Sequence, residues 1–132
     1  MNKSFMKVSL IIPVLFTLLV AHSSLFAQDT KPYLGTWKGA ISGMGQELEI
    51  IVEFSLDDNK NIQGNIDVPI QGATDIPLGD IHIEGKTISF TIVHPQVQGD
   101  PTFKGDLDEN GKKISGDFSQ GGATGTFSIE KE

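Results

Sequence analysis

The sequence predicts an all-β protein, a single antiparallel up-and-down meander of about eight strands that forms a small closed or nearly closed barrel. Three observations carry this prediction. Apolar and polar residues alternate along most of the chain after residue 36, turn-forming residues separate the alternating runs, and no helical period competes with them.

The clearest alternation runs from Glu47 to Leu56, where the even positions are apolar and the odd positions are mostly polar. A period of two is typical of a strand with one buried face and one wet face. The same pattern returns further along the chain. We therefore expect strands over 36–42, 46–56, 62–68, 80–84, 87–93, 102–108, 113–120 and 124–130.

The connections between these runs differ in kind. Asn110-Gly111 is the strongest hairpin signal, because both residues tolerate the positive φ of a two-residue turn. The segment 67–79 contains Pro69 and Pro77, which remove backbone donors and fix φ, and Gly72, which permits a turn. This segment is therefore not expected to be a regular strand; it is a corner of the chain or a binding loop.

The pattern apolar-x-Gly-x-apolar occurs four times, centred on Gly39, Gly64, Gly105 and Gly116. Each glycine has the parity of its apolar neighbours and is expected to face inward. An inward glycine lets a sheet coil sharply and leaves room for a large side chain opposite. We expect an interior that is mostly filled, with at most a shallow apolar mouth.

The first 27 residues have the pattern of a secretory signal peptide. Lys3 and Lys7 precede the apolar run 8–20, and cleavage is expected after Ala27. The run is shorter than the roughly 20 residues of a membrane span. Residues 28–132 are then one exported β-barrel domain, periplasmic or extracellular, and not bound to the membrane once the signal is removed.

Composition excludes several functions. Removing Lys3 and Lys7 leaves 8 of the 10 basic residues against 17 acidic ones, a net charge of −9, and the chain has no arginine. Nucleic acid is a poor partner, because its binding needs clustered cations. The chain has no cysteine, which excludes a disulfide framework and a cysteine nucleophile.

Catalytic and metal-binding residues are not evident. His82 and His94 have no Ser or Asp at a spacing that argues for a triad. Asp106-x-Asp108-x-Asn110-Gly111 followed by Asp117 imitates a calcium loop, but Asn110-Gly111 already serves as a hairpin turn. We expect no catalytic site, no metal site and no cofactor.

Gly35-Thr36-Trp37, at the start of the first strand of a meander, resembles the G-x-W of the calycin superfamily, which includes the lipocalins. The resemblance implies a calycin-like barrel in which Trp37 plugs one end. It also implies that a basic residue of the last strand, here Lys131, covers the tryptophan.

A longer resemblance spans residues 34–129. The chain is similar to the small β-domain that precedes the catalytic domain in some bacterial secreted α/β-hydrolases and peptidases. The shared segments are Gly35-Thr36-Trp37-Lys38-Gly39, residues 67–77 (DVPIQGATDIP) and residues 116–122 (GDFSQGG). No G-x-S-x-G follows, so hydrolase activity is not implied. The resemblance implies an accessory role.

These segments supply the candidate binding residues: Gln71, Gln120, Asp67 and Gly72. Two amides near a barrel rim either close the rim or face a ligand. The expected function is a non-catalytic interaction module that binds a protein, a peptide or an envelope glycan. The alternative is a lipocalin-like carrier of a small apolar ligand, and an enzyme is a distant third. The sequence does not indicate an oligomeric state.

Overall fold

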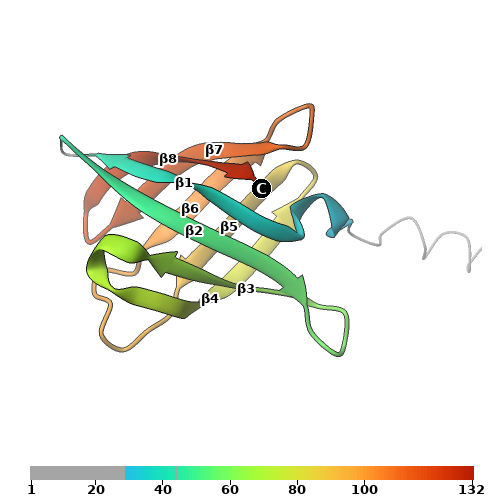
Figure 1. Cartoon of the computed structure of the whole chain (residues 1–132), viewed down its shortest axis with the longest axis horizontal. Helices are drawn as coiled ribbons and strands as arrows, with labels where there is room; N and C mark the ends of the chain where they lie inside the picture. The colour runs from blue at the N-terminus through green and yellow to red at the C-terminus, as the bar shows by residue number, and fades with distance from the viewer. Residues whose placement is uncertain (1–28, 44) are drawn as a thin grey trace, which may run out of the picture.

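A computed structural model describes residues 29–43 and 45–132. The expected signal peptide, residues 1–27, lies outside the described residues. Eight antiparallel strands, each paired with the next and the last with the first, form a closed barrel (Figure 1). The all-β prediction and the up-and-down order are therefore confirmed. Nowhere in the described chain is there a helix of the length and apolar character that a membrane span requires.

The strands agree closely with the alternating runs in the sequence. A short 3-10 helix, η1, precedes them, and a second, η2, follows β3. In chain order the elements are η1 (Lys31–Tyr33), β1 (Gly35–Gly43), β2 (Gln46–Leu56), β3 (Ile62–Val68), η2 (Pro69–Gln71), β4 (Ala73–Glu84), β5 (Thr87–Ile92), β6 (Thr102–Leu107), β7 (Lys113–Gln120) and β8 (Ala123–Lys131).

Strand β4 is longer than expected, since it begins at Ala73 and not near residue 80. The sequence prediction was wrong here because it placed no strand between residues 69 and 79. The strand contains Pro77 and is irregular at two points: Asp75 and Asp80 both have positive φ, and the register with each neighbour shifts. Only the η2 turn, which ends at Gly72, forms a true corner.

The barrel interior is filled by apolar side chains from every strand. Aromatic rings occupy its middle: Phe90 stacks on Phe103 with ring centres 4.8 Å apart, and Phe127 meets Phe103 edge-on at 5.1 Å. Gly105 faces this cluster, because a Cβ placed there would lie 2.7 Å from the Phe127 ring. The small residue therefore makes room for the large one opposite, as the glycine pattern predicts.

The two ends of the barrel differ. We call one the plug end; it holds η1 and the turns after β2, β4 and β6, on the right in Figure 1. Trp37 is fully buried there, and its Nε1–H donates to the Tyr33 carbonyl oxygen at 2.9 Å. The other end, the mouth, is formed by Gly45 and by the connections 69–72, 93–101 and 121–122.

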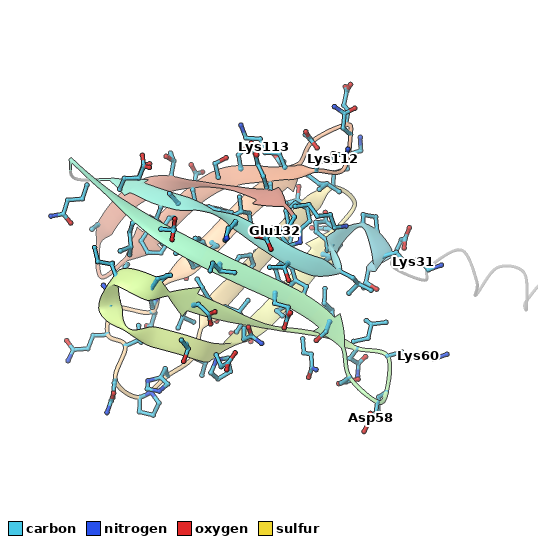
Figure 2. All side chains as sticks on the ribbon, in the orientation of Figure 1. Lys31, Asp58, Lys60, Lys112, Lys113 and Glu132 are labelled. Carbon is cyan, nitrogen blue, oxygen red and sulfur yellow. The ribbon has the colours of Figure 1, made fainter. Side chains whose placement is uncertain are left out.

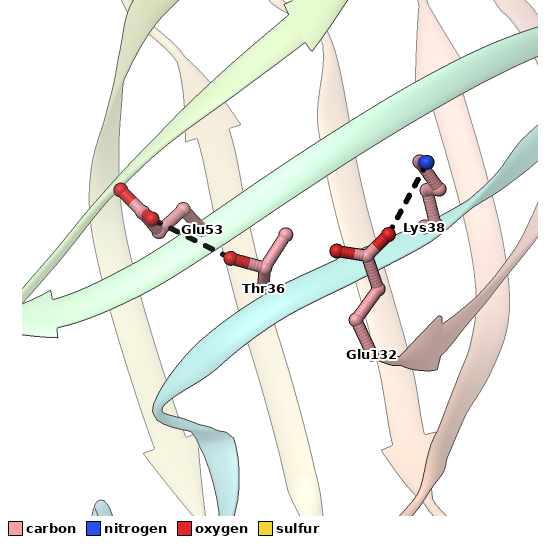
Figure 3. A network of polar contacts seen from close by, with 4 residues as sticks. All are labelled: Thr36, Lys38, Glu53 and Glu132. Carbon is pink, nitrogen blue, oxygen red and sulfur yellow. Dashed lines mark hydrogen bonds and ion pairs between the residues drawn. The ribbon is translucent and has the colours of Figure 1, made fainter.

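The outer surface of β1 carries exposed polar contacts. The Thr36 hydroxyl donates to a Glu53 carboxylate oxygen at 3.4 Å, and Lys38 pairs with Glu132 at 3.2 Å (Figure 3). Both side chains of the ion pair are about half exposed, so its contribution to stability is small.

Candidate functional site

The mouth holds two adjoining cavities, which we call the outer groove and the inner chamber. The outer groove, about 480 Å³, lies between the end of β1, the start of β2, the β7–β8 turn and the loop residues Gln98 and Gly99. The inner chamber, about 130 Å³, lies deeper and is more enclosed. Four residues line both cavities and so form their common wall: Ile41, Leu48, Phe118 and Gln120.

The inner chamber is lined mainly by aliphatic side chains from β1–β5 and from the loop after β5. Its polar lining consists of two glutamines, Gln71 and Gln120. The apolar residues that it does not share with the groove are Ile66, Val68, Ile76, Ile92, Val97 and Pro101.

Among the described residues, none that lines the outer groove or the inner chamber is charged. Their polar side chains are the neutral amides of four glutamines and one hydroxyl: Gln46, Gln71, Gln98, Gln120 and Thr124. A charged ligand group would therefore lose its hydration without gaining an ionic partner. The chemistry of the site favours an uncharged apolar group with amide partners at the rim.

The structure places Gln71 and Gln120 at the same barrel end, on the wall of the same chamber. Neither donates to the other within the hydrogen bonds of the described residues. The Gln120 amide Nε2 instead donates to the Gln98 carbonyl oxygen at 2.8 Å, and the Gly121 N–H donates to the Gly99 oxygen at 2.8 Å. These two bonds fasten the 93–101 loop to the β7–β8 turn.

Gly99 makes this attachment possible. Its φ is +81°, and a Cβ at this position would lie 2.8 Å from the Gly121 nitrogen and 3.0 Å from the Gln120 Cγ. A larger residue would therefore push the loop off the turn.

Asp67 and Gly72, the other two candidate binding residues, have structural roles. The Asp67 carboxylate accepts the Asp75 N–H at 2.7 Å and so stabilises the irregular backbone of β4 at Asp75. Gly72 adopts a left-handed conformation with φ 67°, and its N–H closes the η2 turn on the Pro69 oxygen at 3.0 Å. Neither residue lines the groove or the chamber.

The acidic hairpin that imitates a calcium loop uses its carboxylates internally. Asp108 Oδ1 accepts the N–H groups of Lys112 at 2.9 Å and Lys113 at 3.2 Å, and the Lys112 bond is the main reason that the pKa of Asp108 lies below its usual range. Asp106 accepts the Thr87 hydroxyl at 2.7 Å. Across the residues that the structure describes, no three His, Asp or Glu side chains converge as a metal site would require.

His82 and His94 lie outside both cavities. His82 is exposed on β4. His94 is part of the loop after β5, where its Nδ1 accepts the Gln96 N–H at 3.1 Å, so the ring stabilises a local turn.

The wall residues of the mouth could not be identified from the sequence. Val97, Gln98 and Gln46 come from segments without a recognisable motif, and only the barrel closure brings them together with Gln71 and Gln120. One signal was present: the segments that form the mouth are rich in glutamine and nearly free of charge. Searches against family models, curated proteins and solved structures found no match to this chain.

Proposed function

We propose that this protein is an exported, non-catalytic interaction module that binds a protein partner through the barrel mouth. The observation that carries the proposal is the difference in charge between the two ends. Apart from His94, the mouth connections contain one ionisable residue, Asp100. The plug-end turns 57–61, 85–86 and 108–112 contain seven: Asp57, Asp58, Lys60, Lys86, Asp108, Glu109 and Lys112.

Figure 2 labels four charged residues at the plug end: Lys31, Asp58, Lys60 and Lys112. Depletion of charge is the compositional mark of the centre of a protein–protein interface. The mouth also exposes two large apolar side chains, Ile70 at 80% and Val93 at 57%. A neutral rim with exposed aliphatic side chains is suited to contact with another protein.

The sequence resemblance supports an accessory role, since the related domains stand beside hydrolases. The lining of the two cavities also supports a non-catalytic role, since none of the described residues that line them has an ionisable side chain that would serve as an acid or a base.

Photo-crosslinking in the producing cell tests the proposal. A benzophenone amino acid at position 70 is expected to give an adduct of defined mass that the same group at position 58, on the plug end, does not give. Val93→Glu should abolish the adduct, because it places a charge on the rim. Leu56→Glu is the matched control, since Leu56 is an exposed apolar residue, 39% exposed, at the opposite end. Equal adducts from both ends would contradict the proposal.

A second candidate function is the carriage of a small apolar ligand. The common wall of groove and chamber favours it, because the two cavities together form one apolar recess. A neutral naphthylamine dye distinguishes the functions. Tight binding of one dye per protein would favour a carrier, whereas weak binding is expected of an interaction module.

A further inference from the structure

We propose that the inner chamber is an anchor pocket for one uncharged apolar side chain of a partner polypeptide, and that Gln120 controls its entrance. This inference rests on the proposed function and specifies what the mouth recognises. It follows from the size of the chamber, the chemistry of its lining and the position of Gln120 between the two cavities.

The size of the chamber matches a single side chain. A cavity of about 150 Å³ with an aliphatic and aromatic lining accepts one benzene ring. The inner chamber, at about 130 Å³, is close to this size. Pockets that enclose a whole small molecule usually have about 300–1,000 Å³. The enclosed space therefore fits a phenyl ring or a branched aliphatic group, while the rest of the partner lies outside.

The lining selects against other groups. A lysine or glutamate side chain would enter without an ionic partner, and a sugar would bring more hydroxyls than Gln71 and Gln120 can pair. A polypeptide avoids both difficulties, because its apolar side chain enters and its main-chain amides stay at the rim. Each glutamine amide has both donors and acceptors, so it can pair with a main-chain N–H or C=O.

Gln120 is placed to act as the gate. It lines both cavities, and its amide is held over their boundary by the bond to the Gln98 oxygen. The side chain is exposed, so its rotation does not disturb the core. Breaking this bond would let the Gln120 side chain move out of the common wall and would free its amide for the partner's main chain.

The test uses capped amino acids as probes of single side chains, with methyl- and amide-labelled protein observed by NMR. We expect N-acetyl-phenylalanine methylamide and N-acetyl-leucine methylamide to shift the signals of Ile76, Ile92 and Val97. Intermolecular NOEs from the phenyl ring to the Ile76 and Val97 methyl groups should accompany the shifts. The alanine and lysine analogues should leave these signals unchanged.

Two variants with matched controls sharpen the test. Val97→Phe fills the chamber and should abolish binding of the phenylalanine probe, whereas Leu56→Phe at the plug end should not affect it. Gln120→Glu removes the donor and adds a charge at the entrance, so binding should weaken by about tenfold. Gln63→Glu is its control, since Gln63 is an exposed strand glutamine whose Nε2 donates to Ser55 at 3.3 Å.

Equal binding of the lysine probe, NOEs confined to the outer groove, or unchanged binding by Val97→Phe would overturn the inference. The NOEs are measured on the unmodified protein, so the test holds even if a variant does not fold. A mouth-specific crosslink without side-chain binding would leave the proposed function standing and refute the anchor pocket. Side-chain binding without a mouth-specific crosslink would refute the protein-binding function instead.

Discussion

The Lys131 ammonium lies 5.3 Å from the centre of the Trp37 ring and donates to the Pro32 carbonyl oxygen at 3.0 Å. Trp37 and Lys131 are cross-strand partners of β1 and β8, so their contact lies on the seam that closes the barrel. The resemblance of Gly35-Thr36-Trp37 to the calycin motif implied this contact, and the bond from Lys131 to Pro32 holds η1 against the plug end.

Lys131→Ala is predicted to lower the free energy of unfolding by about 1–2 kcal/mol, because it removes a cation–π contact and a charged hydrogen bond. Lys131→Met retains the aliphatic stem and should have an intermediate effect. Urea unfolding measures both variants. Lys104→Ala, an exposed lysine on β6, is the control and should change stability by less than about 0.5 kcal/mol. Equal losses at both positions would contradict a special role for Lys131.

Gly116→Ala is predicted to destabilise the barrel by about 1–3 kcal/mol or more, the usual range for overpacking. A Cβ on Gly116 would collide with the Lys104 carbonyl and with the Gly105 Cα, and backbone atoms cannot rotate away. Gly43→Ala is the matched strand control, since its Cβ would lie 3.3 Å from the nearest atom. Thermal unfolding should show a larger drop in melting temperature for Gly116→Ala than for Gly43→Ala. The reverse order would refute the close packing inferred at Gly116.

Asp108 should make stability depend on pH in the acid range. Its pKa is lowered in the folded protein, chiefly by the hydrogen bond from the Lys112 N–H. The contribution of Asp108 to the free energy of unfolding is therefore fully present above the ordinary aspartate pKa of about 3.9. It is lost as the pH falls through the lower pKa that Asp108 has in the folded protein. The melting temperature of Asp108→Ala should lie below that of the wild type at neutral pH, and the gap should narrow in acid. A difference in melting temperature that stays the same at every pH would exclude this dependence of stability on Asp108.

Calcium is predicted to leave the stability nearly unchanged. Asp108 and Asp106 already accept hydrogen bonds within the protein, and a ligand that binds tightly to the folded state would raise the melting temperature by mass action. Chelator-treated protein is heated with and without millimolar calcium. A rise of several degrees that Asp108→Asn removes would reveal a calcium site in the hairpin.

Export is predicted to remove residues 1–27 and to leave Gln28 as the N-terminal residue, often cyclised. The intact mass of protein recovered from outside the cytoplasm measures this directly. Recovery of that protein with Lys3 and Lys7 still present would show that the segment is not a cleaved signal.

The fold could be predicted from sequence because alternation is local: Leu48 to Leu56 fix the two faces of β2 without knowledge of any other strand. Irregular strands cannot be predicted from alternation alone. Residues 73–79 belong to β4, although Pro77 breaks the alternation and Asp75 has a positive φ that is unusual outside glycine. The conformation at Asp75 is stabilised by Asp67 on the neighbouring strand, whose carboxylate accepts the Asp75 N–H.

The mouth was predictable only in part, for a related reason. Gln71 and Gln120 were identified because each precedes a glycine in a recognisable segment. Gln120 also shares the parity of Phe118, which predicts an inward position at a strand end. Val97 and Gln98 have no such signal. Their common position depends on the closure of eight strands and on the bond between Gln120 and the 93–101 loop.

Closure of β8 on β1 has a consequence for synthesis. β1 is made first among the strands and β8 last, so the pair that completes the barrel joins distant parts of the chain. Until β8 is available, a growing chain is an open sheet with β1 at a free edge, exposed to pairing with other chains. Long-range pairing of this kind slows folding. The protein should therefore reach its native state only after translation has passed Lys131, and a nascent chain stalled before β8 should bind chaperones and resist compaction.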